Sequence, residues 1–359
     1  MSTDSAAGPA VWLVPAQWLP PTAEKTADAL AAGRISAEEA EQMGYEQLPV
    51  SDGPSAPEMA VRAARRALAR AGLPAEDVGA LWHAWTYYQG HDFWSPAHYV
   101  AARTGALDAV PTGVQQMCNG AGAALRGALH QLTAQPGGGP VLITTADRFA
   151  PPGFDRWHGD YGVWYGDGAT AAVAGTGAAP AGALTLCALV TRAAPELESA
   201  HRDTDAFHPA PHTRSAAVDV RRTKKAFLAA QGGRQAFLGR LRRETTAVLA
   251  DALAGAGLDG AGRGGAGRGG AGRLSTVLLP RLGRATARDV YGPAVAEVTD
   301  APVADLGERT GHLGAGDLLS NLAALADDSG PHRLPPGGCA AVLSAGAGFT
   351  WSAAVVRRA

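Results

Sequence analysis

Apolar residues are spaced along the chain so that helices alternate with short buried strands. Two Ser-x-x-Glu patterns, Ser36–Glu39 and Ser55–Glu58, each predict a helix start at which the serine caps the helix and the glutamate reaches back to it. The second of these helices ends before Gly72. The segment Ala80–Trp85 that follows is apolar except for His83 and predicts a strand.

The same alternation continues to the end of the chain. The pattern predicts strands at 110–117, 141–145, 169–175, 184–192, 275–279, 338–344 and 350–357. It predicts helices at 120–135, 224–257, 285–291 and 314–326. Continuously apolar strands between helices are typical of sheets covered on both faces, so the predicted fold class is α/β.

Two segments interrupt this alternation. Residues 196–222 are rich in His, Asp, Arg and Pro and are too long for a plain connection, so we interpret them as a cover over a binding site. Residues 260–273 repeat Gly, Ala and Arg in a low-complexity pattern that predicts a flexible linker.

Length and composition narrow the class of protein. The 359 residues suffice for two globular units, and the 46% hydrophobic content with only 18% charged residues indicates a packed globule. With 31 Lys and Arg against 33 Asp and Glu, the net charge of -2 supplies no basic field for nucleic acid or an anionic membrane. We expect no nucleic-acid partner.

The cysteines and the apolar runs bear on where in the cell the protein is expected, and the spacing of ligand-type residues bears on metal binding. Three cysteines without a CxxC pair favour a reducing compartment, and we expect a cytoplasmic protein. No apolar run approaches the length of about 20 residues that a membrane span needs, and Met1–Pro9 does not resemble a targeting segment. No spacing of His, Cys, Asp or Glu indicates a metal site.

The most informative cysteine is Cys118, which lies where a predicted strand ends and a helix rich in small residues begins. Free amides and the dipole at a helix N-terminus favour the thiolate form, so Cys118 is the candidate nucleophile. Cys187 and Cys339 lie inside apolar strands, and we expect them to be buried core residues.

A thiolate that attacks an acyl group needs amide donors for the oxyanion and a group that handles protons. The Gly-rich turn Gly346–Phe349 is the candidate source of such amides. Two histidines are candidates for proton handling: His312, in a turn punctuated by glycines, and His201, in the polar cover. Arg281 directly follows a strand and would either hold an anionic group or form a structural ion pair.

Three motifs, taken in order, make the chain similar to β-ketoacyl-acyl-carrier-protein synthase III and the thiolase superfamily over nearly its whole length. They are Met117–Gly122, Tyr165–Ala169 and Gly346–Trp351. The resemblance implies a five-layered αβαβα fold of two similar halves, residues 1–180 and 181–359, and a homodimer.

The resemblance also implies a chemistry. Cys118 would accept an acyl group from a coenzyme A or acyl-carrier-protein thioester, and the amides of Cys118 and Ala347 would form the oxyanion hole. No bound cofactor is implied.

Two departures from the family pattern bear on the reaction. Arg281 occupies the position of the family's catalytic histidine, and His312 that of its asparagine. Condensing members use this pair to stabilise an enolate, so its loss would impair carbon–carbon bond formation. Acyl transfer needs only Cys118, an oxyanion hole and a base, either His312 or His201, with Asp317 to orient an imidazole.

The segments Gly311–Asp317 and Asp155–Trp157 resemble synthase III homologues of secondary metabolism, some of which transfer acyl groups. We therefore predict an acyltransferase of polyketide-type biosynthesis whose acceptor is a hydroxyl, an amine or a thiol. The alternatives are a decarboxylative synthase and a non-catalytic partner subunit. Phe93 and Trp94, with the neighbouring Tyr87 and Tyr88, would line the acyl pocket, form the dimer seam or serve in ordinary packing.

Overall fold

The computed structural model describes residues 10–210, 213–230, 233–258 and 274–358. The predicted linker at 260–273 and the segment Met1–Pro9 lie outside these residues. The strands of the large sheet are β1 (Val11–Trp18), β4 (Ala80–Ala84), β5 (Val110–Val114), β6 (Val141–Asp147), β7 (Gly168–Thr176), β8 (Leu184–Ala193), β9 (Leu274–Leu278), β10 (Val303–Ala304), β11 (Cys339–Gly346) and β12 (Thr350–Arg358).

The order of these strands repeats. Residues before 180 give the order β1-β7-β6-β4-β5, and residues after it give β8-β12-β11-β9-β10. In both sets the inner pairs β4·β6 and β9·β11 are parallel, whereas β6·β7 and β11·β12 are antiparallel. The two sets join through β1 and β8, which pair only over Val11–Leu13.

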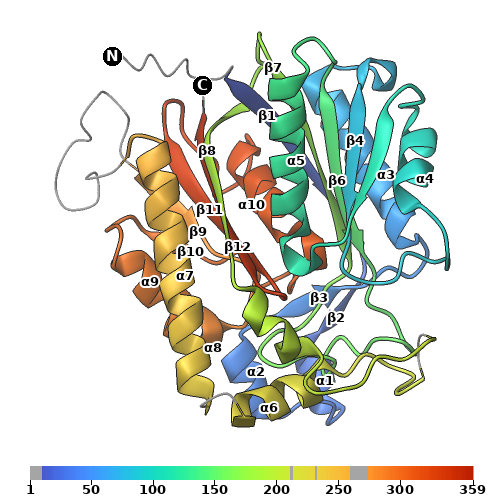
Figure 1. Ribbon diagram of the computed structural model, residues 1–359, viewed down its shortest axis with the longest axis vertical. Helices are drawn as coiled ribbons and strands as arrows, with labels where there is room; N and C mark the ends of the chain where they lie inside the picture. The colour runs from blue at the N-terminus through green and yellow to red at the C-terminus, as the bar shows by residue number, and fades with distance from the viewer. Residues whose placement is uncertain (1–9, 211–212, 231–232, 259–273, 359) are drawn as a thin grey trace.

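The helices lie in three layers around these two sets of strands (Figure 1). Helices α3 (Ala56–Ala71) and α4 (Pro96–Thr104) pack on the outer face of the first set. Helices α5 (Gly120–Ala134) and α10 (Asp317–Ala326) pack between the two sets, in one core that both share. Helices α7 (Gly233–Gly255) and α9 (Gly292–Ala296) cover the outer face of the second set. The result is the predicted αβαβα layering.

Small residues allow the middle layer to pack closely. A Cβ atom added at Gly120, the first residue of α5, would lie 3.0 Å from the Cβ atoms of both Ala84 and Ala315. A larger side chain at this position would therefore push the helix away from β4 and from the turn before α10. The run of small residues after Cys118 thus places the start of α5 deep in the molecule.

The remaining elements lie mostly on one side of the layers, below the sheet in Figure 1. They are α1 (Thr26–Ala31), α2 (Ala37–Met43), the two-stranded antiparallel sheet of β2 (Ala23–Lys25) and β3 (Gln47–Pro49), α6 (Val220–Ala230) and α8 (Arg284–Thr286). In the described ranges, none of the helices combines the length and the apolar run required to cross a bilayer.

Several elements differ from the sequence predictions. Strand β1 was not predicted although it is central, and it contains Pro15. Pro15 lies beyond Leu13, the last residue of β1 that pairs with β8, so its missing amide hydrogen removes no ladder bond on that side. Helix α4 was also missed, and the single helix predicted at 224–257 is instead the two helices α6 and α7.

Candidate active site

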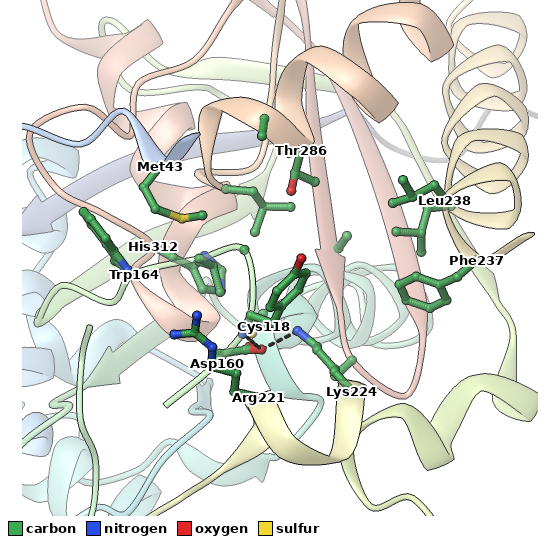
Figure 2. Close-up of a pocket in the computed structure, with 18 of the residues that line it drawn as sticks. Met43, Cys118, Asp160, Trp164, Arg221, Lys224, Phe237, Leu238, Thr286 and His312 are labelled. Atoms are coloured by element: carbon green, nitrogen blue, oxygen red, sulfur yellow. Dashed lines mark hydrogen bonds and ion pairs between the residues drawn. The ribbon is translucent and has the colours of Figure 1, made fainter. Parts of the chain in front are cut away.

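Cys118 lies at a sharp turn between β5 and α5, beside a cavity of about 190 Å3 (Figure 2). A short 3-10 turn, Met117–Asn119, precedes the helix, and Met117 has a φ of +47°. This conformation is uncommon for a residue with a side chain and reverses the chain sharply enough to present the next side chain at the tip. The thiol is 9% exposed and lines the cavity wall.

Asn119 fastens this turn to the other set of strands. Its Nδ2 donates to Thr350 Oγ1 at 3.0 Å and to Ser352 Oγ at 2.9 Å, both on β12. A Cβ atom at Gly122 would lie 2.6 Å from Asn119 Oδ1, so this glycine leaves the space that the amide occupies. The sequence analysis did not identify Asn119 because its partners lie more than 200 residues away.

His312 and Asp317 form a buried pair next to Cys118. The Nδ1 atom of His312 lies 2.6 Å from Asp317 Oδ2. Burial disfavours the imidazolium, but the Asp317 carboxylate, the Cys118 sulfur and hydrogen bonds to both hold the pKa of His312 well above its ordinary value. The structure therefore joins three of the residues that the sequence singled out, and it favours an imidazolium beside the thiol.

The backbone around Asp317 holds this pair in place. Asp317 Oδ1 accepts from the Leu313 amide at 2.9 Å, and Oδ2 accepts from the Arg281 amide at 2.8 Å. Burial alone would raise the pKa of Asp317, yet the imidazolium of His312, the charge of Arg281 and the Leu313 amide lower it. The carboxylate thus stays ionised and can orient the imidazole.

Asp147, at the end of β6, fixes the turn that carries His312. Its Oδ2 accepts from the Ala315 amide at 2.9 Å, and its Oδ1 accepts from the amides of Thr86 and Tyr87 at 2.8 and 2.7 Å. Gly314 has a φ of +58°, and a Cβ atom there would lie 2.2 Å from the Asp147 carboxylate. Only glycine fits this close approach.

The turn after β11 comes within van der Waals distance of the turn that carries Cys118. A Cβ atom at Gly346 would lie 2.4 Å from the Asn119 amide nitrogen and 3.1 Å from that of Cys118. Ala347, the next residue, lines the cavity beside Cys118. The structure thus places Cys118 and Ala347, the two residues whose amides are the expected oxyanion hole, on the wall of one cavity.

Three expected substrate-binding residues lie elsewhere. The Arg281 side chain is buried and donates from Nε to Asn321 Oδ1 at 3.0 Å and from a terminal nitrogen to Thr310 Oγ1 at 2.8 Å. Arg281 is therefore a structural residue and does not line the cavity. Phe93 and Trp94 are exposed on the loop before α4 and do not line the cavity either, so the acyl-pocket interpretation does not hold for them within this chain.

His201 lines the same cavity as Cys118 and His312. It ends the 3-10 helix Pro195–His201 in the predicted cover segment. Burial, and after it the charge of Lys224, lowers the pKa of His201 to about 4, although Asp160 opposes the shift. His201 is therefore a neutral imidazole, whereas His312 is a charged one.

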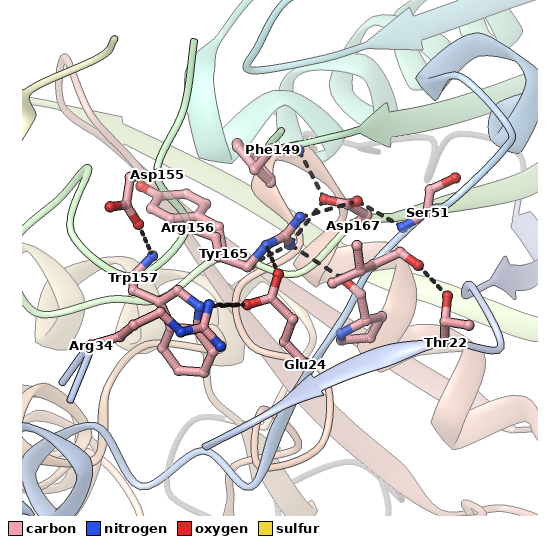
Figure 3. Close-up of polar contacts among 12 residues, drawn as sticks. Thr22, Glu24, Arg34, Ser51, Phe149, Asp155, Arg156, Trp157, Tyr165 and Asp167 are labelled. Carbon is pink, nitrogen blue, oxygen red and sulfur yellow. Dashed lines mark hydrogen bonds and ion pairs between the residues drawn. The ribbon is translucent and has the colours of Figure 1, made fainter. Parts of the chain in front are cut away.

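The cavity wall formed by Trp157 and residues 160–165 rests on a buried ionic network (Figure 3). Asp167 accepts from the amides of Ser51 and Phe149 and from the guanidinium of Arg156 at 3.2 Å. Arg156 also lies 3.4 Å from Glu24, which accepts from the Trp157 indole at 2.8 Å. The network ties the wall to the two-stranded β2·β3 sheet.

Apolar side chains make up most of the remaining wall. They come from α2, α6, α7 and the turn after β11, and they include Met43, Leu228, Phe237, Leu238, Leu241 and Phe349. Helix α6 adds the charged residues Arg221 and Lys224 to the wall, and α7 adds Arg234. Within the described residues, no three His, Cys, Asp or Glu side chains are grouped as metal ligands.

The chain matches no family model and no curated protein sequence. It does match solved structures over nearly its whole length. ChlB3, described as an acyltransferase, is 30% identical with a TM-score of 0.84, and the match covers 98% of each chain. The 3-oxoacyl-(acyl carrier protein) synthase III of Pseudomonas aeruginosa PAO1 is 21% identical with a TM-score of 0.72, over 97% of this chain and 98% of that chain.

A further match is AbyA1, described as a tetronic acid condensing enzyme, which is 20% identical with a TM-score of 0.73. This match covers 97% of this chain and 99% of that chain. At this level of identity, the synthase of Pseudomonas aeruginosa and AbyA1 show the shared fold alone.

Proposed function

The chain belongs to the β-ketoacyl-acyl-carrier-protein synthase III-like group of the thiolase superfamily, and on this basis we propose that it is a cysteine-dependent acyltransferase. Its fold is the five-layered αβαβα arrangement of that superfamily. At the level the relatives establish, it is an acyl-transferring or condensing enzyme. The choice of transfer over condensation, the nucleophile and the substrates belong to the proposal.

The observation that carries the proposal is the contact of Cys118, His312 and Asp317 at the cavity. In the first half of the reaction, the Cys118 thiolate attacks the carbonyl carbon of an acyl thioester. The C–S bond to the donor thiol breaks, and His312 gives its proton to the departing thiolate. The amides of Cys118 and Ala347 accept the charge that develops on the carbonyl oxygen.

Transfer rather than condensation is supported by the side chain of Arg281. Condensing relatives place a histidine and an asparagine at the sites of Arg281 and His312, and here Arg281 is held away from the cavity by Asn321 and Thr310. The carbonyl of a malonyl thioester would therefore have one donor, the imidazole of His312, instead of the histidine and asparagine of the condensing relatives. The acyltransferase description of ChlB3 agrees with this choice.

The donor that we propose is an acyl-coenzyme A or acyl-carrier-protein thioester, and the acceptor a small molecule of polyketide-type secondary metabolism. We further propose a cytoplasmic homodimer. The edge of β5 supports the dimer, because this strand ends the sheet and carries the exposed apolar Val110, with the exposed Leu107 just before it. Phe93 and Trp94 lie exposed on a neighbouring loop and would belong to that interface.

The direct test is the intact mass of the protein after incubation with a panel of acyl-coenzyme A thioesters. We expect one acyl group per chain in the wild type and in Cys187→Ala, which serves as the matched control, and none in Cys118→Ala. Equal labelling of the Cys118 variant, or no labelling with any donor, would overturn the proposal. Release of carbon dioxide from malonyl-coenzyme A would instead identify a condensing enzyme.

A further inference from the structure

A second polar group lies in the cavity outside the triad of Cys118, His312 and Asp317. Asp160 Oδ2 accepts from the hydroxyl of Tyr165 at 2.7 Å, and its Oδ1 accepts from Lys224 and from the Tyr161 amide, both at 2.5 Å. All three side chains line the cavity, and Figure 2 shows Asp160 and Lys224 facing it from below Cys118. Asp160 is 6% exposed, so this ion pair is shielded from solvent.

His201 completes this group. Among the described residues no hydrogen-bond partner contacts either ring nitrogen of His201, and Nδ1 is fully buried. The ring packs edge-on against Phe349, with 6.0 Å between the centroids, and Phe349 ends the Gly346–Phe349 turn. A buried polar ring without a partner costs free energy unless a ligand supplies one.

Tyr165 connects this group to the nucleophile. Its ring lies 5.2 Å from the ring of His312, edge to face, while its hydroxyl is bonded to Asp160. The triad and the second group are thus neighbours that share one cavity wall, as an acyl donor and an acyl acceptor would require.

We propose that His201, supported by Asp160, Tyr165 and Lys224, binds the hydroxyl group of the acyl acceptor and takes its proton. This inference rests on the proposed acyltransferase function and assigns the second half of that reaction to residues other than the triad.

The charges of the site select a hydroxyl over an amine. A primary amine carries a proton at neutral pH and would need a free carboxylate, but Asp160 already accepts from Lys224, Tyr165 and Tyr161. The ammonium of Lys224 would also repel a second cation. An alcohol with an apolar body fits the open imidazole and the apolar walls contributed by Phe237 and Leu238.

His201 removes the hydroxyl proton, the acceptor oxygen forms a bond to the acyl carbon, and the C–S bond to Cys118 breaks. The electron pair returns to sulfur as the thiolate. His312, which gave its proton to the donor thiol in the first half, regains one from solvent, and His201 releases its own, so the site returns to its starting state.

The experiment separates the two halves of the reaction. Acyl-Cys118 enzyme is formed with an acyl-coenzyme A, separated from excess donor and mixed with benzyl alcohol or benzylamine, and loss of the acyl group is followed by intact mass. In the wild type we expect faster loss with the alcohol. His201→Gln and Tyr165→Phe should acylate at the wild-type rate and transfer to the alcohol roughly 100-fold more slowly. The control His158→Gln, an exposed histidine paired with Asp155, should behave as the wild type.

The outcomes are distinct. If His201→Gln and His158→Gln transfer alike, or if benzylamine reacts as fast as benzyl alcohol, the assignment is wrong although the acyltransferase proposal stands. If the His201 variant loses acylation and transfer equally, His201 belongs to the first half and the inference fails. If Cys118 never acylates, the proposed function fails and this inference fails with it.

Discussion

The Nδ1 atom of His312 lies 2.6 Å from the carboxylate of Asp317, five residues further along the chain. Asp317 occupies Nδ1, which leaves Nε2 as the ring nitrogen available to the neighbouring Cys118, whose sulfur also raises the pKa of His312. A helix start and a glycine-rich turn are enough to produce this arrangement: Asp317 begins α10, and His312 lies in the turn just before it.

Replacing Asp317 with asparagine should narrow the pH range of acylation. The carboxylate raises the pKa of His312, so the wild-type imidazolium persists as the pH rises through neutrality. In Asp317→Asn the pKa of His312 falls, and the acylation rate should drop as the pH rises, by on the order of 100-fold at pH 8. Stopped acylation reactions between pH 5 and 9, followed by intact mass, would measure this. Parallel pH profiles for the two proteins would contradict it.

Gly346→Ala should block acylation while the fold remains. The added methyl group would lie 2.4 Å from the amide nitrogen of Asn119, so the turn after β11 must move away from Cys118 and the oxyanion donors separate. We expect a loss of 100-fold or more in acylation rate. Gly53→Ala is the matched control, because a Cβ atom there meets nothing within 4 Å. Equal acylation rates for both variants would show that Ala347 and Cys118 do not act together.

The triad was predictable from the sequence because each of its members lies in a short local pattern. Cys118 precedes a helix of small residues, and His312 and Asp317 are separated by a glycine turn. Asp160, Tyr165 and Lys224 were not identified as site residues because the loop before β7, which carries the first two, and helix α6, which carries the third, meet only in the folded protein. No spacing in one stretch of sequence signals such a meeting.

Arg281 shows a different limit of what the sequence can predict. Its position after β9 is visible in the sequence, but the direction of its side chain depends on Asn321 and Thr310, which lie 40 and 29 residues away. Strand β1 shows a third limit of prediction from sequence. A proline such as Pro15 argues against a central strand, and only the structure shows that the pairing of β1 with β8 ends before it. Local pattern therefore indicates the layers and the position of Cys118 before α5, whereas side-chain direction depends on distant partners.

Removing one partner of the buried ion pair behind the cavity wall should destabilise the protein. Asp167 is fully buried and Arg156 nearly so, with 3.2 Å between them. Arg156→Leu leaves the carboxylate of Asp167 without its cation, which typically costs about 3–5 kcal/mol of unfolding free energy. Arg288→Leu is the control, since its pair with Asp289 is exposed and should change the free energy by less than about 1 kcal/mol. Urea unfolding would compare them, and similar midpoints would contradict the prediction.

Buried neutral histidines should make the protein less stable in mild acid. His83 is fully buried, its ring nitrogens lie 2.9 Å from Thr144 Oγ1 and 3.2 Å from Gln89 Oε1, and burial lowers its pKa from 6.5 to about 4. Between these two values the unfolded chain binds a proton at this site and the folded chain does not. The unfolding free energy should therefore fall as the pH drops from about 6.5 toward 4, by roughly 3 kcal/mol for His83.

His83→Leu should be less stable than the wild type at pH 7, because Thr144 and Gln89 lose their partner, yet its unfolding free energy should depend less on pH below 6.5. The remaining dependence comes in part from His201, whose pKa is also about 4. Urea unfolding at pH 7 and pH 5 measures both effects, with the exposed His158→Gln as the control. If the unfolding free energy fell by the same amount between pH 7 and pH 5 in the wild type and in His83→Leu, His83 would not stay neutral in the folded protein.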